Sequence, residues 1–234
     1  MKVGILQCDD VNEKLQPRHG NYPEMFMALL REQDPSLTFQ TYRAMEGELP
    51  AHPDECDAYI TTGSRHGVND GFDWIADLEH LVRQLYEANK RLVGICFGHQ
   101  LMAKALGGRV IKSEKGWGVG VSFNQLHTEQ PWMSPWQQAM DLIVSHQDQV
   151  VGLPDNAQVL ASSSFCPYYM VQYGDHLMSI QGHPEFSKAY SADLMQMRKG
   201  IIPENRVREG MASLNAALDD RLVLRWIVQF LRGE

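Results

Sequence analysis

The segment Gly94–Gln100 is the feature that most constrains how this chain can fold. Its third residue, Cys96, has one glycine two positions before it and another two positions after it. The mostly apolar residues 92–95 suit a short buried strand, and residues 101–106 are good helix formers that end at two glycines. This spacing is typical of a nucleophile elbow, a sharp strand-to-helix turn that exposes a reactive side chain.

The expected position of Cys96 also favours a reactive thiol. A helix that begins beside it would supply backbone N–H groups and the positive end of a dipole, and both stabilise a thiolate. Most free cysteines are buried core residues. The strand-to-helix corner and the flanking glycines favour the other role here, so we predict that Cys96 is a nucleophile.

Composition and charge limit the partners of the chain. Its 234 residues are 44% hydrophobic and 21% charged, as in a globular protein with a sizeable core. The net charge of −8 and the lack of a large Lys/Arg cluster argue against nucleic acid. No apolar run approaches the roughly 20 residues of a membrane span, and the short apolar start does not resemble a secretion signal. The four cysteines form no Cys-x-x-Cys pair. We expect a soluble protein in the reducing cytoplasm, without a membrane partner.

Strand and helix patterns alternate over the first hundred residues. Strands are predicted at residues 2–8, 37–42, 57–61 and 92–95, and helices at residues 22–31 and 74–89. This alternation favours a parallel sheet with helices on both faces.

The second half has short strand patterns with few helices between them. Strands are predicted at residues 109–111, 119–123, 142–145, 159–161, 169–173 and 176–181. Gly174-Asp175 marks a hairpin turn between the last two. We expect an antiparallel addition that returns to the sheet at Ile180, followed by helices over residues 187–231.

Together these patterns predict an α/β fold. It has a mostly parallel central sheet with helices on both faces, a small antiparallel addition in the second half and a helical C-terminal tail. Residues 1–234 are expected to form a single domain, with a core over about residues 1–187 and a helical extension over about residues 187–234.

Among the nine histidines, His183 is the best placed to act as a base for Cys96. It follows the strand pattern at residues 177–180, so it would lie at the carboxyl edge of the sheet, where α/β active sites form. Glu185 lies two residues further on. Its carboxylate could accept the proton of the imidazole nitrogen that faces away from the thiol, which would fix the tautomer.

Two of these motifs together resemble a known family. Gly-Ile-Cys-Phe-Gly-His-Gln at 94–100, followed about 85 residues later by Gly-His-Pro-Glu-Phe at 182–186, is similar to the class I (triad) glutamine amidotransferases. The likeness runs from about residue 1 to residue 187. It implies that Cys96, His183 and Glu185 are nucleophile, base and orienting carboxylate.

The resemblance also implies residues that bind the substrate. Ser145, His146 and Gln147 fall in the family's Ser-His-x-Asp segment, whose backbone helps to hold the amino-acid end of glutamine. Gln100 falls at the glutamine of the elbow helix that also touches the substrate.

The resemblance also implies one oxyanion hole, with N–H donors from two segments of the chain. Gly63 and Ser64 occupy the position of the family's glycine loop, and the N–H of Phe97 would be the other donor. Two positions depart from the family pattern. Many members have a second glycine where Ser64 stands, and many have an aromatic residue where Gly182 stands.

These features are closest to a stand-alone branch that includes plant γ-glutamyl peptidases and GMP-synthetase-like proteins. The resemblance implies an enzyme that hydrolyses the γ-amide of glutamine or of a related γ-glutamyl compound through a cysteine thioester, with no cofactor and no metal. The chain has no P-loop, no dinucleotide fingerprint and no synthetase domain. Delivery of ammonia would therefore require a separate synthetase or other acceptor chain.

Three alternatives remain open. The first is a γ-glutamyl peptidase or hydrolase without any ammonia acceptor. The second is a non-catalytic binding protein on the same fold, because fold alone does not settle activity. The third is a metal hydrolase that uses His99, His146, His183 and Glu185, although the sequence contains none of the usual metal-binding spacings.

Overall fold

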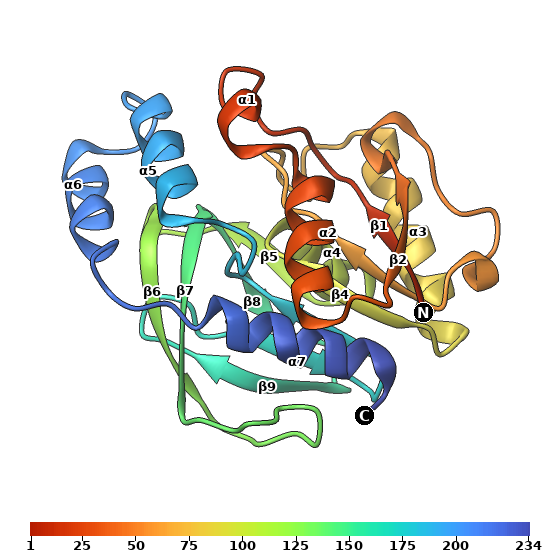
Figure 1. Ribbon diagram of the computed structural model, residues 1–234. Helices are drawn as coiled ribbons and strands as arrows, with labels where there is room; N and C mark the ends of the chain where they lie inside the picture. The colour runs from red at the N-terminus through yellow and green to blue at the C-terminus, as the bar shows by residue number, and fades with distance from the viewer.

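The computed structural model describes all residues 1–234, and a large sheet runs through its centre (Figure 1). The strands are β1 (Lys2–Leu6), β2 (Thr38–Tyr42), β3 (Ala58–Thr61), β4 (Arg91–Ile95), β5 (Arg109–Lys112), β6 (Gly118–Leu126), β7 (Ala139–His146), β8 (Asp148–Gly152), β9 (Ala157–Ser162), β10 (Met170–Tyr173) and β11 (Leu177–Ile180). Nine of them form the sheet in the order β2-β1-β3-β4-β11-β10-β9-β6-β7, and β5 pairs with β8 separately.

The helices lie between and after these strands. They are α1 (Gln16–His19), α2 (Tyr22–Gln33), α3 (Asp73–Glu87), α4 (Phe97–Ala105), α5 (Lys188–Met197), α6 (Glu204–Ser213) and α7 (Asp220–Arg232), with short 3₁₀ turns at Ala44–Glu46 and Pro53–Glu55. None of the helices combines the length and apolar character needed to cross a membrane.

The parallel half of the sheet contains β2, β1, β3, β4 and β11. The three strands β3, β4 and β11 are almost fully buried, as expected for parallel strands that are covered on both faces. β11 pairs with β4 so that Ile180 lies beside Ile95. This register brings the ends of two strands that are far apart in sequence to the same edge of the sheet.

The other half of the sheet is antiparallel. β10 pairs with β11, β9 with β10, β6 with β9, and β7 with β6. The predicted hairpin turn is confirmed, with Gly174 in the left-handed region at φ 58°. The antiparallel addition and its return to the sheet at Ile180 are also confirmed. β8 was not predicted from the sequence.

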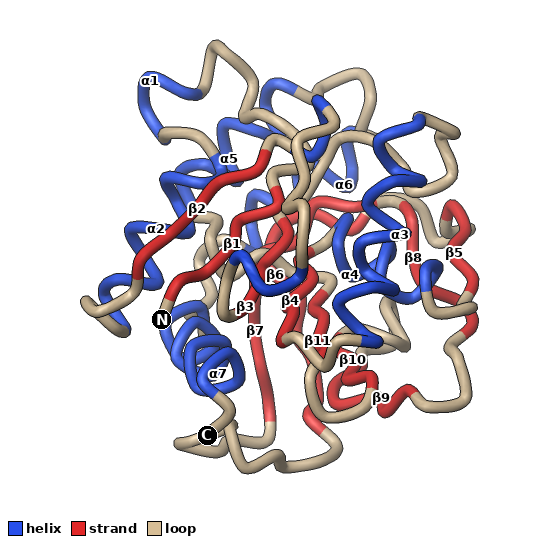
Figure 2. The backbone as a smooth tube through the Cα atoms, turned by 90° about the vertical axis from the view of Figure 1, so that its right-hand side faces the viewer, coloured by secondary structure: helices blue, strands red, loops and turns tan.

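Helices cover both faces of the sheet, as predicted (Figure 2). α2 and α7 lie on one face, and their residues Phe26 and Ile227 share a buried cluster with Ile60 of the sheet. α3 and α4 lie on the other face, where Leu78 and Leu101 belong to a second buried cluster. The core therefore has two layers with the sheet between them.

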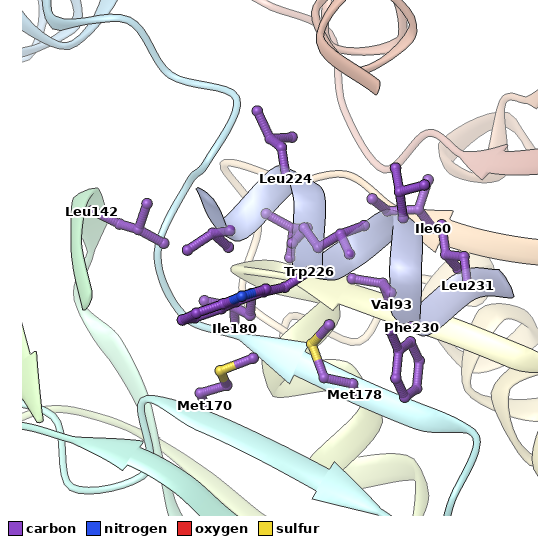
Figure 3. Packing of buried hydrophobic residues seen from close by; sticks show 14 of the residues in the cluster. Ile60, Val93, Leu142, Met170, Met178, Ile180, Leu224, Trp226, Phe230 and Leu231 are labelled. Carbon is purple, nitrogen blue, oxygen red and sulfur yellow. The ribbon is translucent and has the colours of Figure 1, made fainter. Parts of the chain in front are cut away.

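The C-terminal tail is helical, as predicted, and is divided into α5, α6 and α7. In Figure 3, Trp226 of α7 lies over Met170, Met178 and Ile180 of the sheet. The indole N–H of Trp226 donates a hydrogen bond to the Pro135 carbonyl at 3.0 Å, so the polar edge of this buried ring is satisfied.

Candidate active site

Cys96 lies between the end of β4 and the start of α4, at the predicted strand-to-helix corner. Its backbone has φ 51° and ψ −97°, a conformation that non-glycine residues seldom adopt. Such backbone strain is concentrated at functional sites. The N–H of Cys96 donates to the Ile180 carbonyl at 2.9 Å, which ties the corner to the end of β11.

The flanking glycines allow α4 to pack closely against the sheet. An ideal Cβ on Gly98 would overlap the side chain of Thr61. One on Gly94 would lie 2.7 Å from the Gly98 carbonyl oxygen. Real Cβ atoms do not approach other atoms this closely, so both positions require glycine in the present packing.

His183 follows β11 and lies at the same edge of the sheet as Cys96. Its Nδ1 is 2.7 Å from Oε1 of Glu185, and both side chains are buried. The backbone N–H of His183 donates to the Ile143 carbonyl at 2.8 Å. The imidazole also stacks on the Phe186 ring, with the ring centres 3.8 Å apart. Backbone and side chain are therefore both held in place.

The charge of His183 depends on its two neighbours. Burial alone lowers its pKa, but the carboxylate of Glu185 and the sulfur of Cys96 together raise the pKa to about 10. An imidazolium is therefore favoured at neutral pH. In that form, Nδ1–H donates to Glu185 and the other ring nitrogen keeps a proton that it can transfer.

Gly63 and Ser64 follow β3 and lie close to this pair. An ideal Cβ on Gly63 would be 2.8 Å from Cε1 of His183 and 3.7 Å from the Cβ of Cys96. Neither residue donates its backbone N–H to another protein group. Phe97 begins α4, where the first N–H groups have no partner within the helix. The implied oxyanion donors thus lie around the thiol.

A cavity of about 260 Å³ opens onto Cys96, which is smaller than the roughly 300–1,000 Å³ of sites for drug-sized ligands. It is also lined by the implied residues Ser64, Phe97, Gln100, Ser145, His146 and Gln147. His183, Glu185 and Gly63 do not line it.

Three of the implied substrate-binding side chains already have partners in the protein, and the Ser145 hydroxyl accepts a hydrogen bond from Arg198 at 2.8 Å. The side-chain amide of Gln100 donates to the Asp148 carbonyl at 2.9 Å and to the Gln181 side chain at 3.1 Å. His146 has Nδ1 3.0 Å from the Asp148 carbonyl, and burial lowers its pKa to about 4. Gln100 and His146 therefore help to shape the wall around the end of β7, and His146 is neutral at physiological pH.

Sequence reasoning missed two groups of residues in the site. Gln181 is buried, and its side-chain N–H lies 3.6 Å from the Cys96 sulfur. The cavity is also lined by charged and aromatic side chains that were not predicted, namely Arg65, Asp70, Lys112, Trp117 and Arg198. Gln181 could have been noticed because it precedes His183 by two residues at the end of a strand. No local pattern marks the others.

The structure explains one departure from the family pattern. An ideal Cβ on Gly182 would collide with the hydroxyl oxygen of Tyr169 and lie 3.1 Å from the Cβ of Leu142. Tyr169 is fully buried and fills the space beside Gly182. A larger residue at position 182 would have to displace it.

Comparisons with known proteins agree with the sequence motifs. Residues 62–197 match the family described as glutamine amidotransferase class-I. Gamma-glutamyl peptidase 5 of Arabidopsis thaliana is 33% identical over 228 residues, covering 92% of this chain and 89% of that protein. A glutamine amidotransferase-like protein of Gibberella zeae is 24% identical, covering 88% of this chain and 86% of that protein. The crystal structure of a glutamine amidotransferase from Thermotoga maritima has a TM-score of 0.76 and 19% identity, covering 98% of this chain and 96% of that one.

Proposed function

The chain belongs to the class I glutamine amidotransferase family, and we propose that it hydrolyses the γ-amide bond of a small γ-glutamyl compound through a thioester on Cys96. One observation carries this proposal. The strained corner that holds Cys96 and the buried His183–Glu185 pair lie at the ends of two adjacent parallel strands, and Cys96 lines a small cavity.

In the first half of the reaction, the Cys96 thiolate attacks the γ-carbonyl carbon. A C–S bond forms, and the carbonyl electron pair moves to oxygen. The tetrahedral intermediate then collapses, the C–N bond breaks, and His183 gives its proton to the leaving amine. The leaving group is ammonia if the substrate is glutamine and an amino acid or peptide if the substrate is a γ-glutamyl peptide.

In the second half, water hydrolyses the thioester. His183, now neutral, takes a proton from water as the oxygen attacks the same carbon. The C–S bond breaks, which restores the thiolate–imidazolium pair and releases a γ-carboxylic acid, and this acid loses its proton to the solvent. Throughout, Glu185 holds the Nδ1 side of the ring, so His183 exchanges protons through its other nitrogen.

The negative oxygen of both intermediates needs hydrogen-bond donors. The N–H groups of Phe97, Gly63 and Ser64 are the donors that we assign to this role. One such donor is typically worth about 3 kcal/mol of transition-state stabilisation. Ser145, His146, Gln147 and Gln100 are assigned to the wall that holds the glutamyl group.

The relatives favour a peptidase over an ammonia-delivering subunit. Two proteins named γ-glutamyl peptidases, 33% and 30% identical to this chain, are covered over 89% and 86% of their lengths. The alternative is a glutaminase that delivers ammonia to a separate synthetase chain. An assay of the isolated protein with glutamine and γ-glutamyl dipeptides distinguishes the two. Faster hydrolysis of the dipeptides supports the peptidase, and strong activity on glutamine alone supports the subunit.

The thioester mechanism is tested by Cys96→Ala. This variant should lose about 10³-fold or more of its turnover, because no other group replaces the nucleophile. Its melting temperature should stay close to that of the wild type. Cys56→Ala is the matched control, since Cys56 is a buried thiol just before β3, at the opposite edge of the sheet. Full γ-glutamyl hydrolysis by Cys96→Ala would refute the proposal.

A further inference from the structure

Two cations in the wall of the cavity, Arg198 and Lys112, have no carboxylate within 4.0 Å. Arg198 caps the end of α5 and lines the same cavity as Cys96. Its Nη1 donates to the Ser145 hydroxyl at 2.8 Å, but no carboxylate lies within 4.0 Å of its guanidinium. Arg65, which lines the cavity as well, differs in this respect because Asp9 holds it at 2.7 Å. Arg198 is thus free to accept an anion.

An aromatic ring holds this guanidinium in place. The Cζ atom of Arg198 lies 5.7 Å from the centre of the Trp117 ring, within the range of a cation–π interaction. A guanidinium has five N–H donors, and Ser145 uses one of them. The remaining donors form the planar fork that suits a carboxylate.

A second charged group in the same cavity comes from different elements. Lys112 lies opposite Asp148 in the register of β5 and β8, without an ion pair between the two side chains. An ideal Cβ on Gly67 would lie 2.8 Å from Oδ2 of Asp148 and 3.1 Å from Oδ1 of Asp70, so the two carboxylates approach each other there. Two carboxylates and one ammonium in the same cavity wall suit a zwitterion. Every γ-glutamyl substrate carries one, at its α-carbon.

We propose that Arg198 binds a carboxylate on the leaving-group side of the scissile bond and so selects γ-glutamyl peptides that end in a free carboxylate over glutamine. This inference rests on the proposed function. The α-ammonium of the glutamyl group suits the carboxylates of Asp70 and Asp148, and its α-carboxylate suits the ammonium of Lys112. Arg198 is then left for a further anion. Glutamine has no second carboxylate, whereas a γ-glutamyl peptide has one at its C-terminus.

The inference is tested with three substrates: γ-glutamylglycine, its C-terminal amide and glutamine. In the wild type, kcat/KM should be highest for the acid form. Arg198→Gln should lower kcat/KM for the acid form about 10- to 100-fold, the range expected for a lost hydrogen bond to a charged group. The same variant should change the values for the amide and for glutamine less than about threefold.

Arg206→Gln is the matched control. Arg206 also lies over an aromatic ring, 5.8 Å from the centre of Phe165, but it does not line the cavity of Cys96. It should leave all three substrates unchanged. An equal loss for all three substrates in Arg198→Gln would overturn the inference, because Arg198 would then hold the glutamyl head or brace Ser145. Unchanged kinetics would overturn it as well.

A binding measurement separates this inference from the hydrolysis mechanism. Calorimetry on Cys96→Ala should show tighter binding of γ-glutamylglycine than of its amide, and Arg198→Gln in that background should remove the difference. Failure to discriminate between the two, including no binding of either, refutes the role of Arg198. Discrimination in binding without any hydrolysis by the wild type would instead refute the proposed function.

Discussion

Glu185 controls the charge of the proposed base. One of its carboxylate oxygens bonds to His183, and the other, Oε2, is buried without a partner. The negative charge therefore acts mainly on the imidazole. It is the largest of the influences that raise the pKa of His183 against the effect of burial.

We expect Glu185→Gln to lower the pKa of His183, because the amide is similar in shape but uncharged. His183 must be protonated to donate to the leaving amine, so the alkaline limb of kcat/KM should move to lower pH. An opposite charge in contact typically shifts a pKa by about 1–3 units. A pH–rate profile measures the shift. Glu185→Asp keeps the charge and is the control. If the alkaline limb of kcat/KM stays at the same pH in Glu185→Gln, the charge of Glu185 does not raise the pKa of His183.

Gly98 limits how the corner can be built. A methyl group there would overlap Thr61, so Gly98→Ala should destabilise the fold by about 1–3 kcal/mol, as overpacked sites do, and should reduce activity. Urea unfolding provides the measurement. Gly152→Ala is the control, because its nearest neighbour would be Arg109 Cβ at an ordinary 3.5 Å. Equal stability of the two variants would show that the corner adapts.

Among single residues of the site, the sequence predicts those that belong to local motifs. The corner at Cys96 is described by consecutive residues, and His183 and Glu185 belong to one short loop. Arg198 and Lys112 could not be found this way. They reach the cavity only because the end of α5 and the β5–β8 pair fold next to it, and such placement depends on tertiary contacts rather than on local sequence.

Among the elements, the parallel half was the easier half to predict. Long helices separate β1 from β2 and β3 from β4, and buried strands such as β4 are mostly apolar runs. β8 escaped prediction because only Gln147 separates it from β7, with no glycine or proline to mark a turn. It also pairs with β5 rather than with its neighbour in sequence.

Helix α7 offers a test of how the outer layer stabilises the sheet. Trp226 is fully buried in the cluster that contains Met170 and Ile180. Trp226→Ala should lower the free energy of unfolding by about 3–5 kcal/mol, because it opens a cavity in the core. Arg225→Ala, at an exposed position of the same helix, should have little effect. A loss below about 1 kcal/mol in Trp226→Ala would show that α7 contributes little.

For the whole molecule, two buried histidines predict a sensitivity to acid. Burial lowers the pKa of His99 to about 3 and that of His146 to about 4, from an ordinary value of 6.5. Between these values and 6.5, the unfolded chain binds protons that the folded chain excludes. Stability should therefore fall as the pH drops below about 6.5, by about 1.4 kcal/mol per pH unit for each histidine.

Urea unfolding at several pH values between 7 and 4 measures this loss. His99→Gln should reduce the pH dependence, because it removes one of the two groups. His80→Gln alters an exposed histidine on α3 and is the control. A pH dependence that is the same in His99→Gln and in the wild type would exclude His99 as a source of the acid sensitivity.

The position of β11 between β4 and β10 has a consequence for biosynthesis. A growing chain exposes the thiol of Cys96 long before it contains His183. The strand that carries the base must then enter the sheet beside a strand made much earlier. The proposed hydrolysis is thereby tied to completion of the core, because a nascent or truncated chain has the proposed nucleophile without the proposed base.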